Sequence, residues 1–229
     1  MKKGLCVLLV FLFLLSGCTA LAEDAPAANR LLFQGRASLR ITTAEGKVIY
    51  IDPYAGSGYD VPADLILVTH RHEDHNTVSK IKTQNEGCEF INNTMALVKG
   101  EYKTFDLGFV TVEAVQAGNN PNHDIKYCVG WLLTLPGDIT VYVSGDTSTT
   151  DQMAELADRH IDYAFFCCDG IYNMDIDEAI ACAELVGARH NVPYHNDTSS
   201  GLDMERAELF DAPGKLIIRP GEEIVLEKE

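Results

Sequence analysis

The sequence of 229 residues predicts an α/β (α+β) fold in which two sheets pack face to face and helices cover their outer faces. Two observations carry this prediction. Most of the chain consists of short apolar segments separated by turn residues, a pattern typical of strands and hairpins. The later part combines strand patterns with segments whose apolar residues recur at helical spacing. A chain of this length has room for one domain with a sizeable core.

Three hairpins and one buried strand are expected. The hairpins pair residues 39–42 with 48–51, 102–105 with 109–115, and 128–135 with 139–144. Residues 64–69 form a continuous apolar run, which is consistent with a strand buried on both faces.

Two helices follow the hairpins. Thr149 and Gln152, like Asp175 and Glu178, have the spacing of a capping box at a helix start. Gly187 is placed to end the second helix. Strands that alternate with such helices complete a layered domain.

The charge balance argues against nucleic acid as a partner. The chain has 18 Lys and Arg residues against 34 Asp and Glu residues, a net charge of −16. Its average field therefore repels phosphate backbones and anionic lipid surfaces. We expect a small-molecule substrate instead.

The N-terminus predicts export and a lipid anchor. Residues 1–17 contain two lysines, an apolar run and small residues, which is typical of a signal peptide. The run ends in Leu-Ser-Gly before Cys18, which resembles the lipobox of bacterial lipoproteins and implies acylation of Cys18. An uncleaved anchor, or an ordinary signal with a chance Cys, is the alternative. We expect residues 18–30 to be a flexible tether, residues 31–229 to be the catalytic domain, and the protein to be a membrane-anchored lipoprotein on the extracytoplasmic side.

Five cysteines remain beyond the N-terminal segment: Cys88, Cys128, Cys167, Cys168 and Cys182. None has the C-x-x-C spacing of a zinc site. We interpret the adjacent pair Cys167 and Cys168 as small buried hydrophobes, with a disulfide or a metal contact as alternatives.

The strongest functional pattern is a loop that directly follows the apolar run. It holds His70, His72, Asp74 and His75 within six residues, and the whole chain has only seven His. Imidazole nitrogens and carboxylate oxygens are ligands that Zn²⁺ accepts. His70 and His72 lie on one side of an extended turn, and Asp74 and His75 can face a second ion. This loop predicts a metal site for one or two ions.

Two more ligand-type residues end predicted strands. Asp146 follows the apolar segment 141–144 after Gly145, and a simple turn or helix cap is the alternative role. His195 ends the segment 191–195, and His190 at its other end is the competing residue. A lone His at a strand start is more often a surface or core residue, so we favour His195.

These motifs resemble those of the metallo-β-lactamase superfamily, whose members are mostly hydrolases with one or two metal ions. The loop His70-x-His72-x-Asp74-His75 is similar to the superfamily's signature loop. Asp146 lies in a Gly-Asp-Thr segment similar to the one whose Asp bridges two metals, and His195 lies in a Pro-x-His segment similar to the one that supplies the last ligand. The resemblance implies the metallo-β-lactamase fold, a four-layer αβ/βα sandwich of two mixed sheets.

The remaining ligand is assigned through one branch of the superfamily. In ascorbate-6-phosphate lactonases and their relatives a His lies in the loop before a Val-Gly strand, and His123 before Val129 resembles this layout. Several other branches place the His directly after the preceding strand, at Gly118 or Asn119 in this chain.

The resemblance also implies how the ligands are divided. It gives His70, His72 and His123 to one ion, gives Asp74, His75 and His195 to the other, and makes Asp146 the bridge. Two divalent ions are expected, with Zn²⁺ as first choice and Mn²⁺ or Fe²⁺ as alternatives. Asp74 or Asp146 would relay the proton.

The expected function is a metal-dependent hydrolase that uses a metal-bound hydroxide on an ester, lactone or phosphodiester. A metal-binding lipoprotein without turnover is the alternative from another class, and a nuclease is a third. The segment Cys167-Cys168-Asp169-Gly170 stands where many relatives have a Pro-containing loop. The shape of the substrate opening is therefore not implied.

Overall fold

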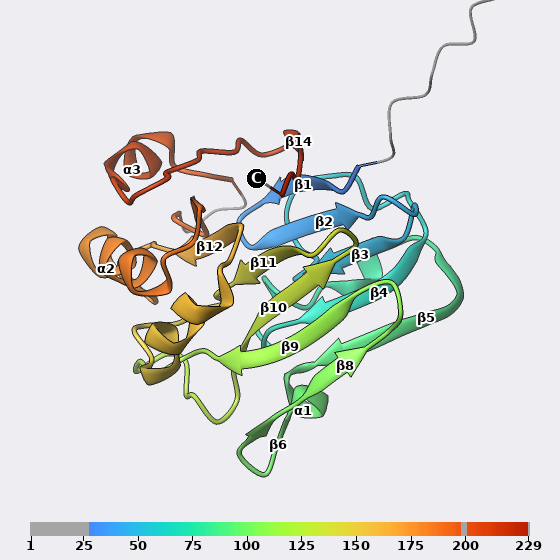
Figure 1. The fold of residues 1–229 in the computed structure, drawn as a ribbon, viewed down its shortest axis with the longest axis horizontal. Coiled ribbons are helices and arrows are strands. Elements are labelled where there is room, and N and C mark those ends of the chain that lie inside the picture. The colour runs from blue at the N-terminus through green and yellow to red at the C-terminus, as the bar shows by residue number, and fades with distance from the viewer. Residues whose placement is uncertain (1–27, 198–200, 229) are drawn as a thin grey trace, which may run out of the picture.

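The computed structural model describes residues 28–197 and 201–228, and it arranges their main strands in two six-stranded sheets that pack face to face (Figure 1). The signal peptide, Cys18 and most of the tether proposed above lie outside these residues. The expected α/β sandwich of two mixed sheets is confirmed.

The first sheet has the strand order β14-β1-β2-β3-β4-β5. Its strands are β1 (Arg30–Gly35), β2 (Ser38–Thr42), β3 (Val48–Ile51), β4 (Ala63–Val68), β5 (Gln84–Asn92) and β14 (Glu223–Val225). Strands β3, β4 and β5 are parallel, and the other pairs are antiparallel. The hairpin of β2 and β3 was predicted.

Strand β1 was not predicted, and it moves the start of the domain. It begins at Arg30, the last residue assigned to the tether. The side chain of Asn29 is already packed, since its amide donates a 2.8 Å hydrogen bond to the Pro136 carbonyl. The folded part therefore begins slightly before residue 31.

The second sheet has the order β13-β12-β11-β10-β9-β8. Its strands are β8 (Thr104–Asp106), β9 (Thr111–Gln116), β10 (Val129–Leu135), β11 (Ile139–Val143), β12 (Tyr163–Cys167) and β13 (His190–Tyr194). The pairs β8–β9 and β10–β11 are the other two predicted hairpins, and β11, β12 and β13 are parallel. A small hairpin of β6 (Leu97–Val98) and β7 (Glu101–Tyr102) forms a separate two-stranded sheet, and β7 contacts β9 of the second sheet.

The main core lies between the two sheets. It joins side chains such as Phe33 and Leu67 of the first sheet to Trp131 and Phe165 of the second, all fully buried. Every residue of β4 is buried, because a second apolar cluster around Tyr50 covers the outer face of the first sheet. This two-sided burial explains the continuous apolar run in the sequence.

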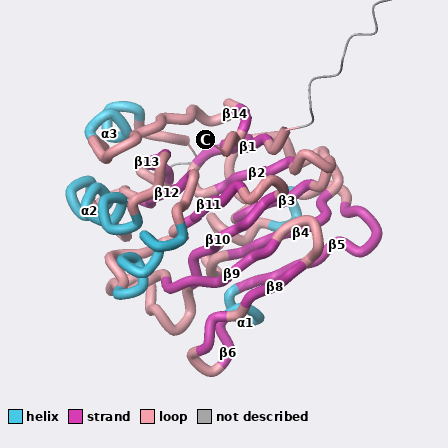
Figure 2. Tube along the Cα trace, in the orientation of Figure 1, coloured by secondary structure: helices cyan, strands magenta, loops and turns pink. Residues whose placement is uncertain are grey.

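The helical segments gather mainly beside the second sheet (Figure 2). They are α2 (Ile176–Val186), α3 (Met204–Leu209) and the 3₁₀ helix η2 (Asp151–Arg159), and α2 packs against β12 and η2. The first sheet has only short covering segments among the described residues, η1 (Val78–Lys80) and α1 (Asn93–Ala96).

One of the two predicted capping boxes forms in part, and the other is wrong. The Asp175 side chain accepts a hydrogen bond from the Glu178 backbone N–H at the start of α2, and Gly187 ends α2 with a φ of 64°. Thr149, by contrast, precedes a 3₁₀ helix whose N-cap is Thr150, which makes no side-chain cap. The Thr149 hydroxyl and N–H instead bond the Glu178 carboxylate, so tertiary contacts replace the local box.

The five described cysteines are all free, and Cys167 and Cys168 are fully buried. Their interpretation as small buried residues is confirmed. Among the described helices, none is long and apolar enough to cross a membrane.

Candidate metal centre

The structure brings all seven predicted ligands to one end of the two sheets. They lie in the loops after β4, β9 and β11 and at the end of β13: His70, His72, Asp74, His75, His123, Asp146 and His195. Three groups of potential ligand atoms lie within 4.8 Å of one another: His70 with His72 and His123, His70 with His75 and Asp146, and Asp74 with His75 and His195. His190 is not among them; its ring stacks on Tyr163 at 4.8 Å.

Asp52, directly after β3, holds in place the loop after β4 that carries His70 to His75. Its carboxylate accepts hydrogen bonds from the backbone N–H and the hydroxyl of Thr69, at 2.8 and 2.7 Å. It also lies 2.7 Å from Nδ1 of His75, which fixes that ring so that Nε2 faces the site. Asp52 is fully buried. The sequence indicated only that it ends the hairpin.

The loop before His123 needs a glycine. Gly118 has a φ of 95°, and a Cβ there would lie 2.7 Å from the His123 carbonyl oxygen. The loop turns back tightly because the Asn120 side chain accepts hydrogen bonds from the N–H groups of Asn122 and His123. His123 thereby reaches the site that a ligand directly after β9 would occupy.

Asp146 lies between the two sets of histidines. Its Oδ2 is 3.2 Å from Nε2 of His123, while its Oδ1 is 3.2 Å from Nε2 of His75 and 3.4 Å from Nε2 of His195. The preceding Gly145 has a φ of 63°, and a Cβ there would press on the Val129 carbonyl at 2.9 Å. Glycine at position 145 thus allows the Asp146 carboxylate to reach the histidines from the end of β11.

Asp169, at the end of β12, supports His195 from behind. Its Oδ2 is 3.5 Å from Nδ1 of His195, and its Oδ1 accepts the N–H groups of Ile171 and Tyr172. Burial raises the pKa of Asp169, but the contact with His195 and these backbone bonds outweigh it and lower the pKa to about 2. The sequence did not indicate this role.

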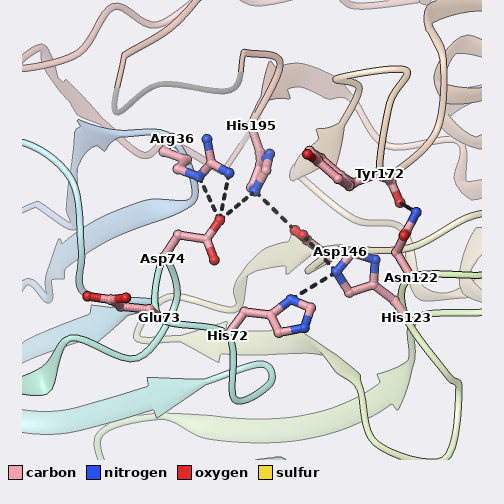
Figure 3. Close-up of a pocket in the computed structure, with 9 residues that line it drawn as sticks. All are labelled: Arg36, His72, Glu73, Asp74, Asn122, His123, Asp146, Tyr172 and His195. Carbon is pink, nitrogen blue, oxygen red and sulfur yellow. Dashed lines mark hydrogen bonds and ion pairs between the residues drawn. The ribbon is translucent and has the colours of Figure 1, made fainter.

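Arg36, in the turn between β1 and β2, is a second residue that sequence reasoning missed. Its Nε and Nη2 lie 2.7 and 2.6 Å from Oδ2 of Asp74 (Figure 3). Burial favours the neutral form of Asp74, but the adjacent imidazoles of His195 and His75 and the hydrogen bonds from Arg36 hold its pKa well below its usual range.

The charges of the histidines fall into two sets. Burial lowers the pKa of both His70 and His123. For His195 burial also opposes protonation, but the carboxylates of Asp146 and Asp169 outweigh it and raise the pKa to about 9. The pKa of His75 is likewise raised by Asp146 and Asp52. The imidazoles of His75 and His195, which lie against carboxylates, therefore favour the protonated form, and those of His70 and His123 favour the neutral form.

The donor set fits divalent metal ions. Nε2 of His75, Nε2 of His195 and Oδ1 of Asp146 are buried and make no hydrogen bond among the described residues. Such atoms are costly to bury without a partner, and a cation at their meeting point would supply one. Imidazole and carboxylate ligands suit Zn²⁺, Mn²⁺ and Fe²⁺.

A pocket of about 570 Å³ opens onto these residues. Figure 3 shows His72, Asp74, Asp146 and His195 around its floor, with Glu73 directed away from them. Glu73 and Arg71 are exposed, and Arg71 stacks over the Tyr127 ring.

Backbone strain is concentrated at this end of the molecule. Seven non-glycine residues in the described part have positive φ, and four of them lie in the site: Arg36, Asp52, Asn119 and His195. Left-handed backbone at non-glycine residues costs free energy and persists where the surroundings impose it. The site is thus held in a geometry that local preference does not supply.

Comparison with known proteins agrees with the fold and the site. Residues 30–195 match the family model described as the beta-lactamase superfamily domain. The protein is therefore a member of the metallo-β-lactamase superfamily, as its two mixed sheets and His/Asp cluster also indicate.

More particularly, the chain belongs to the UPF0173 family of metal-dependent hydrolases. A member from Geobacillus thermodenitrificans is 31% identical, and the alignment covers 86% of this chain and 100% of that protein. The crystal structure of a protein from Parabacteroides distasonis, assigned as a metal-dependent hydrolase, has a TM-score of 0.70 at 26% identity and covers 85% of this chain and 94% of that one. The metallo hydrolase Igni18 from Ignicoccus hospitalis shares the fold, with a TM-score of 0.67 at 18% identity over 88% of this chain and all of that one.

Proposed function

We propose that the protein is a dinuclear hydrolase of a neutral ester or lactone. The observation that carries this proposal is the position of Asp146, which directs one oxygen toward His123 and the other toward His75 and His195. One carboxylate with an oxygen on each side is suited to hold two ions together. His70, His72 and His123 would hold one ion, and Asp74, His75 and His195 the other.

Two divalent ions at these positions would lower the pKa of a bound water to about 7 and polarise the oxygen of the bond under attack. Asp74 is the more open of the two candidate proton relays, since its side chain is 23% exposed and that of Asp146 is 4% exposed. Asp52 and Asp169 fix the rings of His75 and His195. We favour Zn²⁺, with Mn²⁺ or Fe²⁺ as alternatives.

The lining of the pocket favours a carbonyl substrate over a phosphodiester. Arg36 is the one Lys or Arg among the described lining residues, and its guanidinium is bonded to Asp74 and to the Asp197 carbonyl. Sites for phosphate usually offer Arg or Lys donors to the phosphate oxygens. Half-exposed Tyr172 offers an aromatic surface at the mouth, suited to an apolar substituent. The layout around His123 resembles that of ascorbate-6-phosphate lactonases, which supports a lactone carbonyl as the point of attack but does not bear on the charge of the rest of the substrate.

The test is turnover of matched substrates by metal-loaded protein. Aryl esters, simple lactones and bis-aryl phosphodiesters should be compared at equal concentration, with chelator-treated protein as the control. We expect hydrolysis of esters or lactones that chelator abolishes and added metal restores. Turnover of phosphodiesters alone would contradict the substrate class, and metal binding without any turnover would support a non-catalytic protein.

We also propose that the protein is exported and anchored outside the cytoplasmic membrane through Cys18. Support comes from the sequence: a signal-like segment ends at this cysteine. The family match begins at residue 30, the last residue of the proposed tether. A small molecule, and no nucleic acid, is the partner that this acidic protein would meet there.

A further inference from the structure

Arg36 is fixed beside the second group of ligands by its own backbone. Its carbonyl accepts a 3.0 Å hydrogen bond from the N–H of His195, and its N–H donates to the Gly201 carbonyl. Its φ is 49°, an uncommon value for a residue with a side chain. The guanidinium therefore lies next to His195 as a consequence of how the turn between β1 and β2 is held.

The guanidinium bonds the oxygen of Asp74 that also faces the histidines. Nε and Nη2 of Arg36 lie 2.7 and 2.6 Å from Oδ2, and Nη1 donates to the Asp197 carbonyl at 3.0 Å. The same Oδ2 lies 3.6 Å from Nε2 of His195 and 3.9 Å from Nε2 of His75. The Arg36 side chain is only 11% exposed, so water screens this charge weakly.

The first group of ligands has no such neighbour. Among the described residues, no Lys or Arg forms a hydrogen bond or ion pair with His70, His72 or His123; their polar contacts are with one another, with Thr69 and with Asp146. Arg71, the nearest cation in sequence, stacks over the Tyr127 ring. The second group therefore has a buried cation bonded to one of its ligand oxygens, in addition to the carboxylates of Asp52 and Asp169 behind its imidazoles, whereas no cation among the described residues bonds the first group.

We propose that Arg36 weakens the binding of the ion held by Asp74, His75 and His195, here called the second ion, by competing with it for the Asp74 carboxylate. The inference rests on the dinuclear site proposed above. A guanidinium takes lone pairs of the same oxygen and repels a divalent cation nearby. The ion at His70, His72 and His123 does not meet this competition, so the guanidinium raises the dissociation constant of the second ion alone.

A purely structural role for Arg36 has the opposite consequence. If its bonds served to aim Asp74 at the ion, removing them would weaken the second ion, because the carboxylate would lose its orientation. The direction of the change in the second dissociation constant therefore separates competition from positioning.

The experiment is a stepwise Zn²⁺ titration of chelator-stripped, full-length protein against a competing chromophoric chelator, compared between the parent and Arg36→Met. Arg40→Met is the matched control: Arg40 has a similarly buried side chain that bonds Glu223 and the Gly58 carbonyl, away from the site. We expect the second dissociation constant to fall by about 10- to 100-fold in Arg36→Met, the range of one charge-assisted hydrogen bond. The first dissociation constant should not change, and Arg40→Met should behave like the parent.

Arg36→Gln provides a second reading should the Met variant fail to fold, since Gln removes the charge and keeps donors for neighbouring carbonyls. Arg36→Gln should also lower the dissociation constant of the second ion. If these variants bind two ions and the second dissociation constant is unchanged or larger than in the parent, the proposal for Arg36 is overturned and the dinuclear site still stands. At most one ion per chain at saturation, in parent and variants alike, would overturn the dinuclear site itself.

Discussion

Asp146 contacts candidate ligands from both sheets, and its removal is the most direct test of the site. Asp146→Ala should lower the activity by more than the roughly 10- to 100-fold that is typical when a residue bonded to a metal ligand is removed. Both ions would lose a shared carboxylate ligand. The fold should survive, since the side chain packs against ligands and not in the apolar core. Activity, metal content and circular dichroism measure the three effects.

His190→Ala is the control for that variant. His190 begins β13 and stacks on Tyr163, whereas His195 follows the end of the same strand in the site. His190→Ala should keep its metal and its activity. A His190 variant as inactive as Asp146→Ala would mean that the ligand assignment is wrong.

The raised pKa of His195 predicts how stability depends on pH. Without metal its pKa is about 9, above the ordinary value of 6.5, so the folded state holds the proton more tightly than the unfolded chain. This stabilisation is complete below about pH 6.5 and is lost as the pH rises through about 9, at a cost of up to roughly 3 kcal/mol.

Calorimetry of chelator-treated and metal-loaded protein between pH 6.5 and 9 checks this prediction. The melting temperature of the chelator-treated protein should fall across this range. The metal-loaded protein should not follow it, because ions take the place of the protons on the imidazoles. The same fall in both samples would contradict it.

Residues adjacent in the sequence were the ones that sequence reasoning could assign. His70, His72 and His75 lie in one loop, and their density alone predicts a metal site. Arg36, Asp52 and Asp169 were missed because their partners lie far along the chain. Asp52 and Asp169 do follow apolar segments, the same signal that singled out Asp146, so that rule applied to every strand would have found them.

At the scale of elements, helix α2 carries a testable local feature. The Asp175 side chain caps its first turn through the Glu178 N–H at 2.9 Å. Asp175→Ala should cost about 1 kcal/mol, which corresponds to a fall of about 2–4 °C in melting temperature for a chain of this size. Asp177, exposed in the same turn, carries the same charge without the cap. Asp177→Ala should therefore change the melting temperature less, and an equal effect would argue for charge in place of capping.

Elements whose signal is local were predicted, and those that depend on tertiary contacts were not. The three hairpins follow from turn residues between apolar runs, and all three formed. Strand β1 was missed although it forms a hairpin with β2, because Arg36-Ala37 in the connection is not a typical turn pair and its other partner, β14, lies at the far end of the chain. Thr149 was misassigned because Glu178, 29 residues away, offers its hydroxyl and N–H a better acceptor than a local box.

At the scale of the whole molecule, the anchor proposal predicts where the protein is found. Cys18→Ala should move the protein from the membrane to the soluble extracytoplasmic fraction, because acyl chains on that residue would be its attachment. Fractionation and labelling with a fatty acid analogue measure this. A variant that still sediments with membranes, together with a parent that takes up no label, would contradict the proposal.

The direction of β1 has a consequence for how an anchored molecule would present its pocket. The strand starts at Arg30, the last residue of the proposed tether, and ends at Gly35, next to Arg36 in the metal centre. Its six residues span roughly 20 Å, so the tether joins the domain at the end opposite the pocket. Held by that end, the domain would turn its opening outward, and its substrates would arrive from the surrounding medium instead of from the lipid bilayer.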